Sequence, residues 1–233
     1  MTALKNAVVL VTGGSRGIGK ALVEELYTRG AGKVYATARD PRTVTHPDAV
    51  PLALEVTDPA SVAAAAEQAQ DVTVLINNAG NSVGGSFLDT PVEDVRREFD
   101  INFYGPLLVT RAFAPIIERN GGGHILNVHS VLSWLGSAGS YSASKAALWQ
   151  QTNSLRLELR PRGIAVTGLH VGYVDTDLTT RIDAPKSDPR TVAALALDGV
   201  EAGAHEVLAD DVSRQVKAGL SGELAALYPQ LAQ

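Results

Sequence analysis

Cysteine is absent from the 233 residues, and methionine occurs once. Without thiols the chain can form neither disulfides nor thiolate metal sites, and this composition suits a reducing cytoplasm. An excess of basic residues is also lacking: 20 lysines and arginines stand against 25 acidic residues, and the net charge is -5. That balance argues against nucleic acids and anionic membranes as partners. The histidines lack metal-ligand spacing, so we predict no metal; they are His46, His124, His129, His170 and His205.

Long hydrophobic runs are missing as well. The first apolar stretch, residues 7–12, stops at a glycine and is too short for a membrane span or a signal-peptide core. The chain also lacks a linker rich in Pro, Gly and Ser, an internal repeat and a low-complexity tail. With 45% hydrophobic residues it can bury a sizeable core. We therefore expect one domain over residues 1–233, in a soluble cytoplasmic protein.

Short apolar runs recur between stretches of helical length. The runs predict buried parallel strands at 7–12, 33–37, 51–56, 72–77, 124–129, 164–171 and 206–210. Helices are predicted at 17–30, 59–70, 91–119, 141–160 and 189–203. Three helix starts place a capping side chain before a proline, at Asp58-Pro59, Thr90-Pro91 and Asp188-Pro189. The alternation predicts a doubly wound α/β sheet with helices on both faces.

A glycine-rich turn, TGGSRGIG at residues 12–19, joins the first predicted strand to the first predicted helix. Glycines let backbone N–H groups approach a ligand, and a helix N-terminus favours a pyrophosphate. Gly13, Gly17 and Gly19 have a G-x-x-x-G-x-G spacing, a variant of the dinucleotide-binding fingerprint. A purely structural turn is the alternative, but the strand–turn–helix context favours a phosphate site.

The end of the second predicted strand indicates which dinucleotide binds. An acidic side chain there holds the ribose 2′-hydroxyl of NAD, whereas an arginine accommodates the 2′-phosphate of NADP. Ala38 stands at the expected acidic position, Arg39 follows it, and Arg16 in the glycine loop is a second cation. Asp40 would be the ribose acid if the register were shifted by two, and either arginine could be an ordinary surface charge. We predict NADP.

Tyr141 and Lys145 in YSASK are four residues apart on a predicted helix, which places them on one face. A lysine charge about 4 Å from a phenolate stabilises it by about 4 kcal/mol at an effective dielectric near 20. That is the free energy that corresponds to lowering the pKa of a tyrosine by ~3 units, before desolvation. The pair predicts an acidified phenol; the alternative is a surface pair whose stem packs on the ring.

These motifs together resemble the short-chain dehydrogenase/reductase family over nearly the whole chain. The matching stretches are TGGSRGIG (12–19), NNAG (77–80), DINFYG with Asn102, NVHS with Ser130, YSASK (141–145) and GYVDT (172–176). The resemblance implies a single Rossmann-type domain with about seven parallel strands. It also implies oxidation of alcohols or reduction of carbonyls with NAD(P).

The resemblance assigns four catalytic roles. It makes Tyr141 the general acid/base, Lys145 the residue that lowers its pKa and holds the nicotinamide ribose, and Ser130 the ligand of the substrate oxygen. Asn102 would anchor a water in a proton relay. Ser130 and Tyr141 are eleven positions apart, fewer than we expect for relatives, which puts the shape of the pocket in doubt more than the chemistry.

The remaining site residues are expected to border the cofactor. Glu55 and Val56 would flank the adenine, although relatives usually have aspartate at the first position, and Val174 and Thr176 would fix the nicotinamide amide. The full expected set is Thr12, Gly13, Ser15, Arg16, Gly17, Ile18, Gly19, Arg39, Glu55, Val56, Asn78, Ala79, Gly80, Tyr141, Lys145, Gly172, Val174 and Thr176.

The sequence thus predicts an NADPH-dependent oxidoreductase that acts on a small, apolar ketone, aldehyde or secondary alcohol. An NAD-linked alcohol dehydrogenase and a non-enzymatic dinucleotide sensor are the alternatives. The resemblance implies a substrate lid at about 177–203 and a homodimer or homotetramer. Leu132, Trp134 and Leu135 could form an apolar substrate wall or buried packing. His129 is expected in the core, and His170 could approach the nicotinamide.

Overall fold

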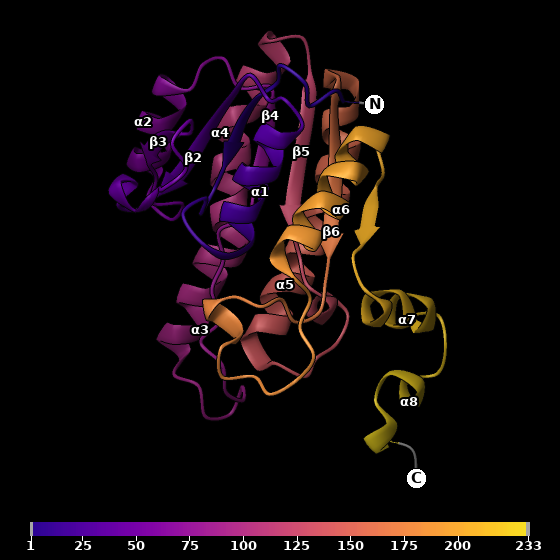
Figure 1. Ribbon diagram of the computed structural model, residues 1–233. Helices are drawn as coiled ribbons and strands as arrows, with labels where there is room; N and C mark the ends of the chain where they lie inside the picture. The colour runs from indigo at the N-terminus through magenta and orange to yellow at the C-terminus, as the bar shows by residue number, and fades with distance from the viewer. Residues whose placement is uncertain (1, 232–233) are drawn as a thin grey trace.

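The computed structural model describes residues 2–231. Within them, seven parallel strands form one sheet in the order β3-β2-β1-β4-β5-β6-β7 (Figure 1). The chain order reverses between β1 and β4, and sheets of this type bind ligands beyond the carboxyl ends of the strands at such a reversal. The strands are β1 Val8–Val11, β2 Lys33–Ala38, β3 Val50–Ala53, β4 Val74–Asn77, β5 Gly123–Val128, β6 Ile164–His170 and β7 Glu206–Leu208.

Helices cover both faces of this sheet, which confirms the predicted Rossmann-type single domain. Helices α1 and α6 bury one apolar cluster against the sheet, and α2, α4 and α5 bury a second cluster on the opposite face (Figure 1). The helices are α1 Gly17–Thr28, α2 Pro59–Gln68, α3 Val92–Phe99, α4 Gly105–Arg119, α5 Gly139–Leu159, α6 Pro189–Ala202, α7 Asp211–Gly219 and α8 Leu224–Leu227.

The helix predicted at 91–119 is interrupted. A π-helical turn, Asp100–Tyr104, separates α3 from α4, and the N–H of Gly105 donates to the carbonyl oxygen of Asp100, five residues back. Pro106 follows directly and has no N–H to give to the carbonyl of Asn102. The interruption buries the Asn102 side chain, so it brings a predicted site residue inward.

Two of the three predicted helix starts are confirmed. Asp58 accepts a hydrogen bond from the N–H of Ala60, and Asp188 from the N–H of Arg190, both at 3.0 Å. The start at Thr90-Pro91 is wrong, because α3 begins at Val92 without a side-chain cap. The Thr90 hydroxyl instead donates to the carbonyl of Ser86 at 2.6 Å, which stabilises the preceding loop.

Two predicted strands end earlier than expected, and a side-chain hydrogen bond follows each end. The strand predicted at 51–56 ends at Ala53, and the N–H of Glu55 donates to the Ser61 hydroxyl at 2.9 Å. The strand predicted at 206–210 ends at Leu208. Asp210 instead caps α7, where it accepts from the N–H of Ser213 at 2.8 Å.

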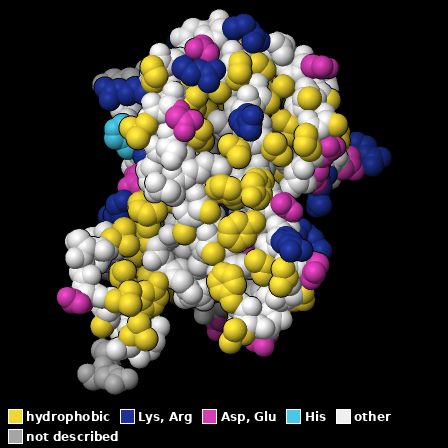
Figure 2. Space-filling view, turned by 180° about the vertical axis from the view of Figure 1, so that it is seen from behind, with side chains coloured by type: hydrophobic (Ala, Val, Ile, Leu, Met, Phe, Trp, Pro, Cys, Tyr) yellow, Lys and Arg dark blue, Asp and Glu magenta, His cyan; other side chains and the backbone are white. Residues whose placement is uncertain are grey.

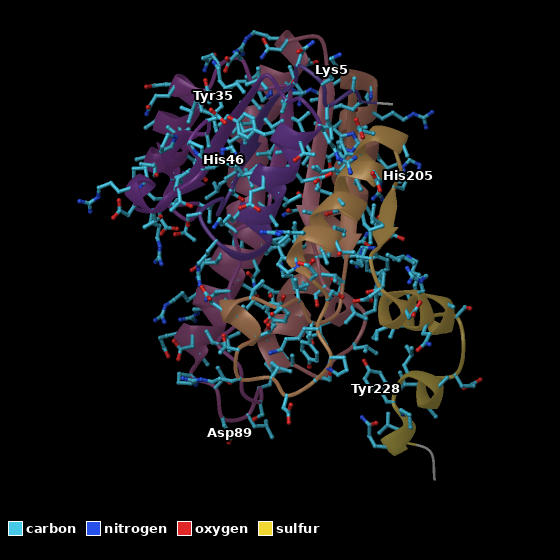
Figure 3. All side chains as sticks on the ribbon, viewed as in Figure 1. Lys5, Tyr35, His46, Asp89, His205 and Tyr228 are labelled. Carbon is cyan, nitrogen blue, oxygen red and sulfur yellow. The ribbon has the colours of Figure 1, made fainter. Side chains whose placement is uncertain are left out.

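The strands direct their carboxyl ends toward one end of the molecule. Figure 3 shows Asp89, in the loop after β4, and Tyr228, in the C-terminal segment, at this end, whereas Lys5 lies at the opposite end. Helices α7 and α8 extend from the body there (Figure 1). None of the helices within residues 2–231 has the length and apolar character needed to cross a membrane.

The core beneath α4 yields a test of the fold. Phe113 is fully buried in the cluster under α2, α4 and α5, so Phe113→Ala should lower the free energy of unfolding by roughly 3–5 kcal/mol, because it leaves a cavity. Urea denaturation of the cofactor-free protein measures this. Leu88→Ala removes a side chain that is 96% exposed and should change the free energy by less than about 0.5 kcal/mol. Equal effects of the two variants would contradict the packing described.

Candidate active site

The glycine loop between β1 and α1 is held against the end of β4. The Thr12 hydroxyl accepts from the N–H groups of Asn78 and Ala79 at 2.9 and 3.0 Å. The Asn78 amide donates to the carbonyl oxygens of Thr12 and Gly13 at 2.9 and 3.1 Å. A Cβ at Gly19 would lie 2.0 Å from the Gly13 oxygen, so only glycine fits there. Thr12 and Asn78 therefore support the predicted phosphate cradle by fixing its backbone.

Two further loop residues predicted to contact the cofactor, Ser15 and Ile18, are half-buried, and Ile18 packs on the core cluster under α1. Gly17 has φ +54°, and a Cβ there would lie 3.3 Å from the Thr176 side chain. Arg16 forms an ion pair with Asp177 at 3.0 Å, with both side chains largely exposed. The segment after β6 thus meets the glycine loop across the predicted cofactor cleft.

The residues of GYVDT are fixed from two sides. The N–H of Gly172 donates to Asp210 at 2.6 Å, which ties this segment to the start of α7. Val174 is buried in the core, and its backbone pairs with Ser187. Because its side chain points into the core, Val174 can offer only backbone groups to a ligand. The side chain of Thr176 instead lies beside Gly17, at the predicted cofactor cleft.

The end of β2 presents an arginine and no free carboxylate. Ala38 is the last residue of β2, as the sequence predicts, and Arg39 is exposed beside it. Asp40 accepts hydrogen bonds from the guanidinium of Arg42 at 2.9 Å and from the Arg42 N–H at 3.1 Å. These bonds hold the pKa of Asp40 below its usual value. The carboxylate that could have bound a ribose is thus engaged with a neighbour.

Glu55 and Val56 lie in the loop after β3 rather than in the strand. The Glu55 carboxylate accepts from the Thr57 hydroxyl at 3.0 Å. Val56 is buried and packs where α4 begins, since a Cβ on Gly105 would lie 2.9 Å from it. Val56 thereby connects the predicted adenine side of the cleft to the π-helical turn.

Ser130, Tyr141 and Lys145 come together beyond the end of β5. Ser130 begins the turn after β5, and its side chain lies close enough to the phenol of Tyr141 to lower the pKa of that group. Lys145 lies one turn along α5, with its ammonium 5.8 Å from the centre of the Tyr141 ring. The ammonium donates to the carbonyl oxygen of Val128 at 2.9 Å. A Cβ on Gly80 would lie 3.5 Å from this ammonium, so the glycine keeps the space beside it open.

The pKa of the phenol corrects the expectation drawn from sequence. Burial raises the pKa of Tyr141 to about 12, and the side chain of Ser130 offsets this only in part. Burial also lowers the pKa of Lys145 to about 8. In the protein without cofactor, desolvation is the largest cause of both shifts, because both groups lose water that stabilises their charged forms.

Asn102 uses its whole side-chain amide within the protein. Its oxygen accepts from the N–H of Asn81 at 3.0 Å. Its nitrogen donates to the Asn81 carbonyl at 2.9 Å and to the Ser144 hydroxyl at 3.0 Å. Asn102 thereby fixes the loop after β4 against α5, one residue before Lys145.

A chain of buried hydrogen bonds ends at the carbonyl oxygen of Ser130. His170 Nδ1 lies 3.3 Å from that oxygen, His170 Nε2 lies 3.0 Å from His129 Nδ1, and His129 Nε2 lies 2.8 Å from the Thr152 hydroxyl. Burial lowers the pKa of His170 to about 4 and that of His129 well below its usual value, so both rings are neutral.

Both ends of the histidine pair approach a carbonyl acceptor. His170 Nδ1 lies 3.3 Å from the Ser130 oxygen, and the Thr152 hydroxyl beside His129 donates to the Leu148 oxygen at 2.8 Å. Thr152 also accepts from the Asn127 amide, 2.8 Å away. His129 is in the core, as predicted. His170 lies beneath Ser130 and is fully buried.

Trp134 belongs to the packing rather than to an exposed substrate wall. It is buried and stacks on His170 at 3.9 Å between ring centres. The Lys217 ammonium of α7 lies 4.9 Å from the Trp134 ring and 5.1 Å from the Trp149 ring. Leu132 and Leu135 are half-exposed and remain available to contact a ligand.

The sequence prediction missed Glu98, which is fully buried between α3 and α5. Its helix reads VEDVRREF, whose charges are typical of an exposed surface, so no sequence signal marks this one carboxylate. Within residues 2–231, no group of three or more histidine, aspartate or glutamate side chains is placed to hold a metal ion.

Comparisons with known proteins agree with this geometry. The family model described as short chain dehydrogenase matches residues 7–187. The NADPH-dependent 1-acyldihydroxyacetone phosphate reductase of Schizosaccharomyces pombe is 38% identical over 184 residues, which cover 74% of this chain and 62% of that enzyme. Dehydrogenase/reductase SDR family member 7B of Mus musculus is 31% identical over 229 residues, 90% of this chain and 70% of the mouse protein.

A solved structure extends the similarity to the whole chain. A short chain dehydrogenase from Burkholderia cenocepacia in complex with NADP superposes with a TM-score of 0.94, at 36% identity and with 100% of both chains covered. The similarity of sequence and of structure favours the two enzymatic interpretations over the dinucleotide sensor. The chain belongs to the short-chain dehydrogenase/reductase family and is an oxidoreductase of that family.

Proposed function

We propose that the protein is an NADPH-dependent reductase of small, apolar ketones or aldehydes, which it reduces reversibly to alcohols. The convergence of Ser130, Tyr141 and Lys145 beside Gly80 and the glycine loop is the observation that carries this proposal. The name of the fission-yeast relative, which includes an NADPH-dependent reduction, and the bound NADP of the Burkholderia cenocepacia structure support it.

Each proposed catalytic residue has a defined task. When bound, the nicotinamide supplies the hydride for the carbonyl carbon. Ser130 holds the carbonyl oxygen, and Tyr141 gives its phenolic proton to that oxygen as negative charge develops on it. Lys145 holds the nicotinamide ribose and places a positive charge near the phenolate that remains.

The pKa of Tyr141 favours reduction over oxidation. A value of about 12 keeps the phenol protonated at neutral pH, which is the acid form that reduction needs. Oxidation needs the phenolate, and lowering the pKa from about 12 to neutrality requires about 7 kcal/mol. The value of about 12 already holds with Lys145 in place, so the further stabilisation of the phenolate has to come from the bound cofactor, whose oxidised nicotinamide carries a positive charge.

Asn102 is proposed to serve the proton relay through its main chain. Its side-chain amide is fully used by Asn81 and Ser144, which leaves the main-chain oxygen to hold a relay water. Pro106 lacks the N–H that would otherwise bond this oxygen in an α-helix.

Cofactor preference is proposed to come from Arg16 and Arg39. Both are exposed at the mouth of the predicted cofactor cleft. The uncharged Ala38 stands at the position where an acidic side chain would hold the ribose of NAD. A guanidinium binds a 2′-phosphate through charge-assisted hydrogen bonds. NAD-linked alcohol oxidation stays the second candidate, because a Burkholderia phymatum relative in complex with NAD is 25% identical, with a TM-score of 0.84.

The other expected cofactor contacts are retained in this proposal. They are Thr12, Gly13, Ser15, Gly17, Ile18, Gly19, Glu55, Val56, Asn78, Ala79, Gly80, Gly172, Val174 and Thr176. We propose a narrower lid, residues 177–188, within the predicted range 177–203. Helix α6 occupies most of the remaining range and packs on α1 beneath the surface.

We propose that the protein is a cytoplasmic homodimer or homotetramer. Figure 2 shows apolar side chains gathered over the middle of the face opposite to that of Figure 1. Tyr104, at the start of α4, and Leu157, on α5, are 50% and 77% exposed, which suits a subunit contact through these helices.

The proposed acid can be tested by a single hydroxyl deletion. Tyr141→Phe should lower kcat for carbonyl reduction by about 100-fold or more, because no other acid donates to the substrate oxygen. NADPH absorbance with a panel of ketones and aldehydes measures the rate, and NADPH fluorescence should show that the variant still binds cofactor. Tyr35→Phe makes the same chemical change far from the site (Figure 3) and should leave kcat unchanged. A Tyr141→Phe variant as fast as the parent would reject the mechanism.

Cofactor preference is tested by charge removal at the cleft mouth. Arg39→Ala and Arg16→Ala should each raise KM for NADPH by roughly 10-fold or more and change KM for NADH little, since only NADPH carries the 2′-phosphate. Arg160→Ala, an exposed arginine at the opposite end of α5, serves as the control. Equal losses with both cofactors, or a parent that prefers NADH, would favour the NAD-linked dehydrogenase.

A further inference from the structure

Glu98 is a buried carboxylate that the proposed mechanism does not use. It lies on α3 with none of its surface exposed to solvent. One carboxylate oxygen accepts from the N–H of Val83 at 2.9 Å, and the other accepts a short hydrogen bond from the Ser140 hydroxyl. A buried carboxylate is costly unless its charge is compensated, so its presence calls for a physical reason.

The two hydrogen bonds of Glu98 join the segments on either side of the catalytic groups. Val83 belongs to the loop after β4, which Asn102 also fixes through Asn81. Ser140 lies in the first turn of α5, directly before Tyr141. Glu98 therefore determines how this loop is placed relative to the helix that carries Tyr141 and Lys145.

The charge of Glu98 acts on the same two groups. Within residues 2–231 no cationic side chain lies within 4.0 Å of its carboxylate, and the ammonium of Lys145 likewise contacts only the Val128 carbonyl. The negative charge of Glu98 raises the pKa of both Lys145 and Tyr141. The loop residues 81–83 that pack on Glu98 carry no ionisable side chain, so Tyr141 and Lys145 are the titratable groups that face it from α5.

We propose that Glu98 is a positioning residue for the proposed Tyr141–Lys145 pair. Its two hydrogen bonds connect the loop 81–83 to α5, and its negative charge is the buried counter-charge of Lys145. This inference rests on the proposed function for its catalytic consequence. Its electrostatic part concerns the protein without cofactor and can be tested separately.

The counter-charge explains how a buried lysine stays protonated. Burial alone favours the neutral amine, and the pKa of Lys145 is already only about 8. A unit charge about 10 Å away shifts a pKa by about one unit at an effective dielectric near 20. Removal of the Glu98 charge would therefore leave Lys145 largely neutral at pH 8. Because the same charge also raises the pKa of Tyr141, the pKa of the phenol would fall as well.

Two substitutions separate the effect of the Glu98 charge from the effect of its hydrogen bonds. Glu98→Gln keeps an acceptor for the Val83 N–H and a polar partner for Ser140, but it removes the charge. Ser140→Ala removes one hydrogen bond and keeps the charge. Glu93→Gln changes an exposed carboxylate on the same helix and serves as the matched control. Melting temperatures establish that the three variants are folded.

The first measurement needs neither cofactor nor turnover. The 13Cε resonance of Lys145 is titrated in cofactor-free protein labelled at lysine and assigned with Lys145→Gln. Glu98→Gln should lower the pKa of Lys145 by about one unit, whereas Glu93→Gln and Ser140→Ala should leave it near the parent value. If Glu98→Gln and the parent titrate at the same pH, the counter-charge role is wrong.

The second measurement reads the catalytic consequence. With the best carbonyl of the panel and its alcohol, Glu98→Gln should move the pH profiles of kcat/KM for reduction and oxidation to lower pH by about one unit. Ser140→Ala should raise KM for the carbonyl several-fold without moving the pH profiles. If KM is unchanged by Ser140→Ala, the hydrogen-bonded connection between the loop 81–83 and α5 has no effect on the pocket. A parent that turns over no carbonyl contradicts the proposed function alone, while the lysine titration still decides the role of Glu98.

Discussion

Partial loss of water from the half-buried Tyr141 and the buried Lys145 is the constraint to which the surrounding structure responds. Neither group can ionise cheaply on its own, because burial raises the pKa of the phenol and lowers that of the ammonium. The neighbours each supply part of what water would have provided: a hydroxyl from Ser130, a carbonyl from Val128 and a charge from Glu98. The proposed chemistry depends on this balance, since a cofactor that binds beside the pair changes it by one further charge.

The register of the sheet places polar groups beneath this pair. Asn77 and Asn127 are register partners on β4 and β5, and their amides form a hydrogen bond of 2.8 Å. Asn127 continues the contact to Thr152 on α5. A core built only of aliphatic residues would leave α5 free to shift on the sheet. The buried amides fix one position, because each misplaced polar group would lose its partner.

Local patterns made most of the site predictable. The glycine loop, the four-residue spacing of Tyr141 and Lys145, and the apolar strands all depend on residues close together in the sequence. The π-helical turn at Asn102 was not predicted, because the helical pattern of 91–119 continues through it. Glu98 was missed for a similar reason: its burial depends on Val83 and Ser140, which lie 15 and 42 residues away. The sign of the pKa change at Tyr141 also required the depth of burial, which spacing alone does not reveal.

The hydrogen-bond chain beneath Ser130 has a consequence for the route of protons. The chain runs from the Asn77 amide through Asn127, Thr152, His129 and His170 to the carbonyl oxygen of Ser130, and the Thr152 hydroxyl also donates to the carbonyl oxygen of Leu148. An amide at one end and a carbonyl at the other neither release nor take up a proton near neutral pH. The chain is therefore a structural support rather than a path for protons. A proton lost from the phenol has to be replaced from the cleft side of the molecule and not through its interior.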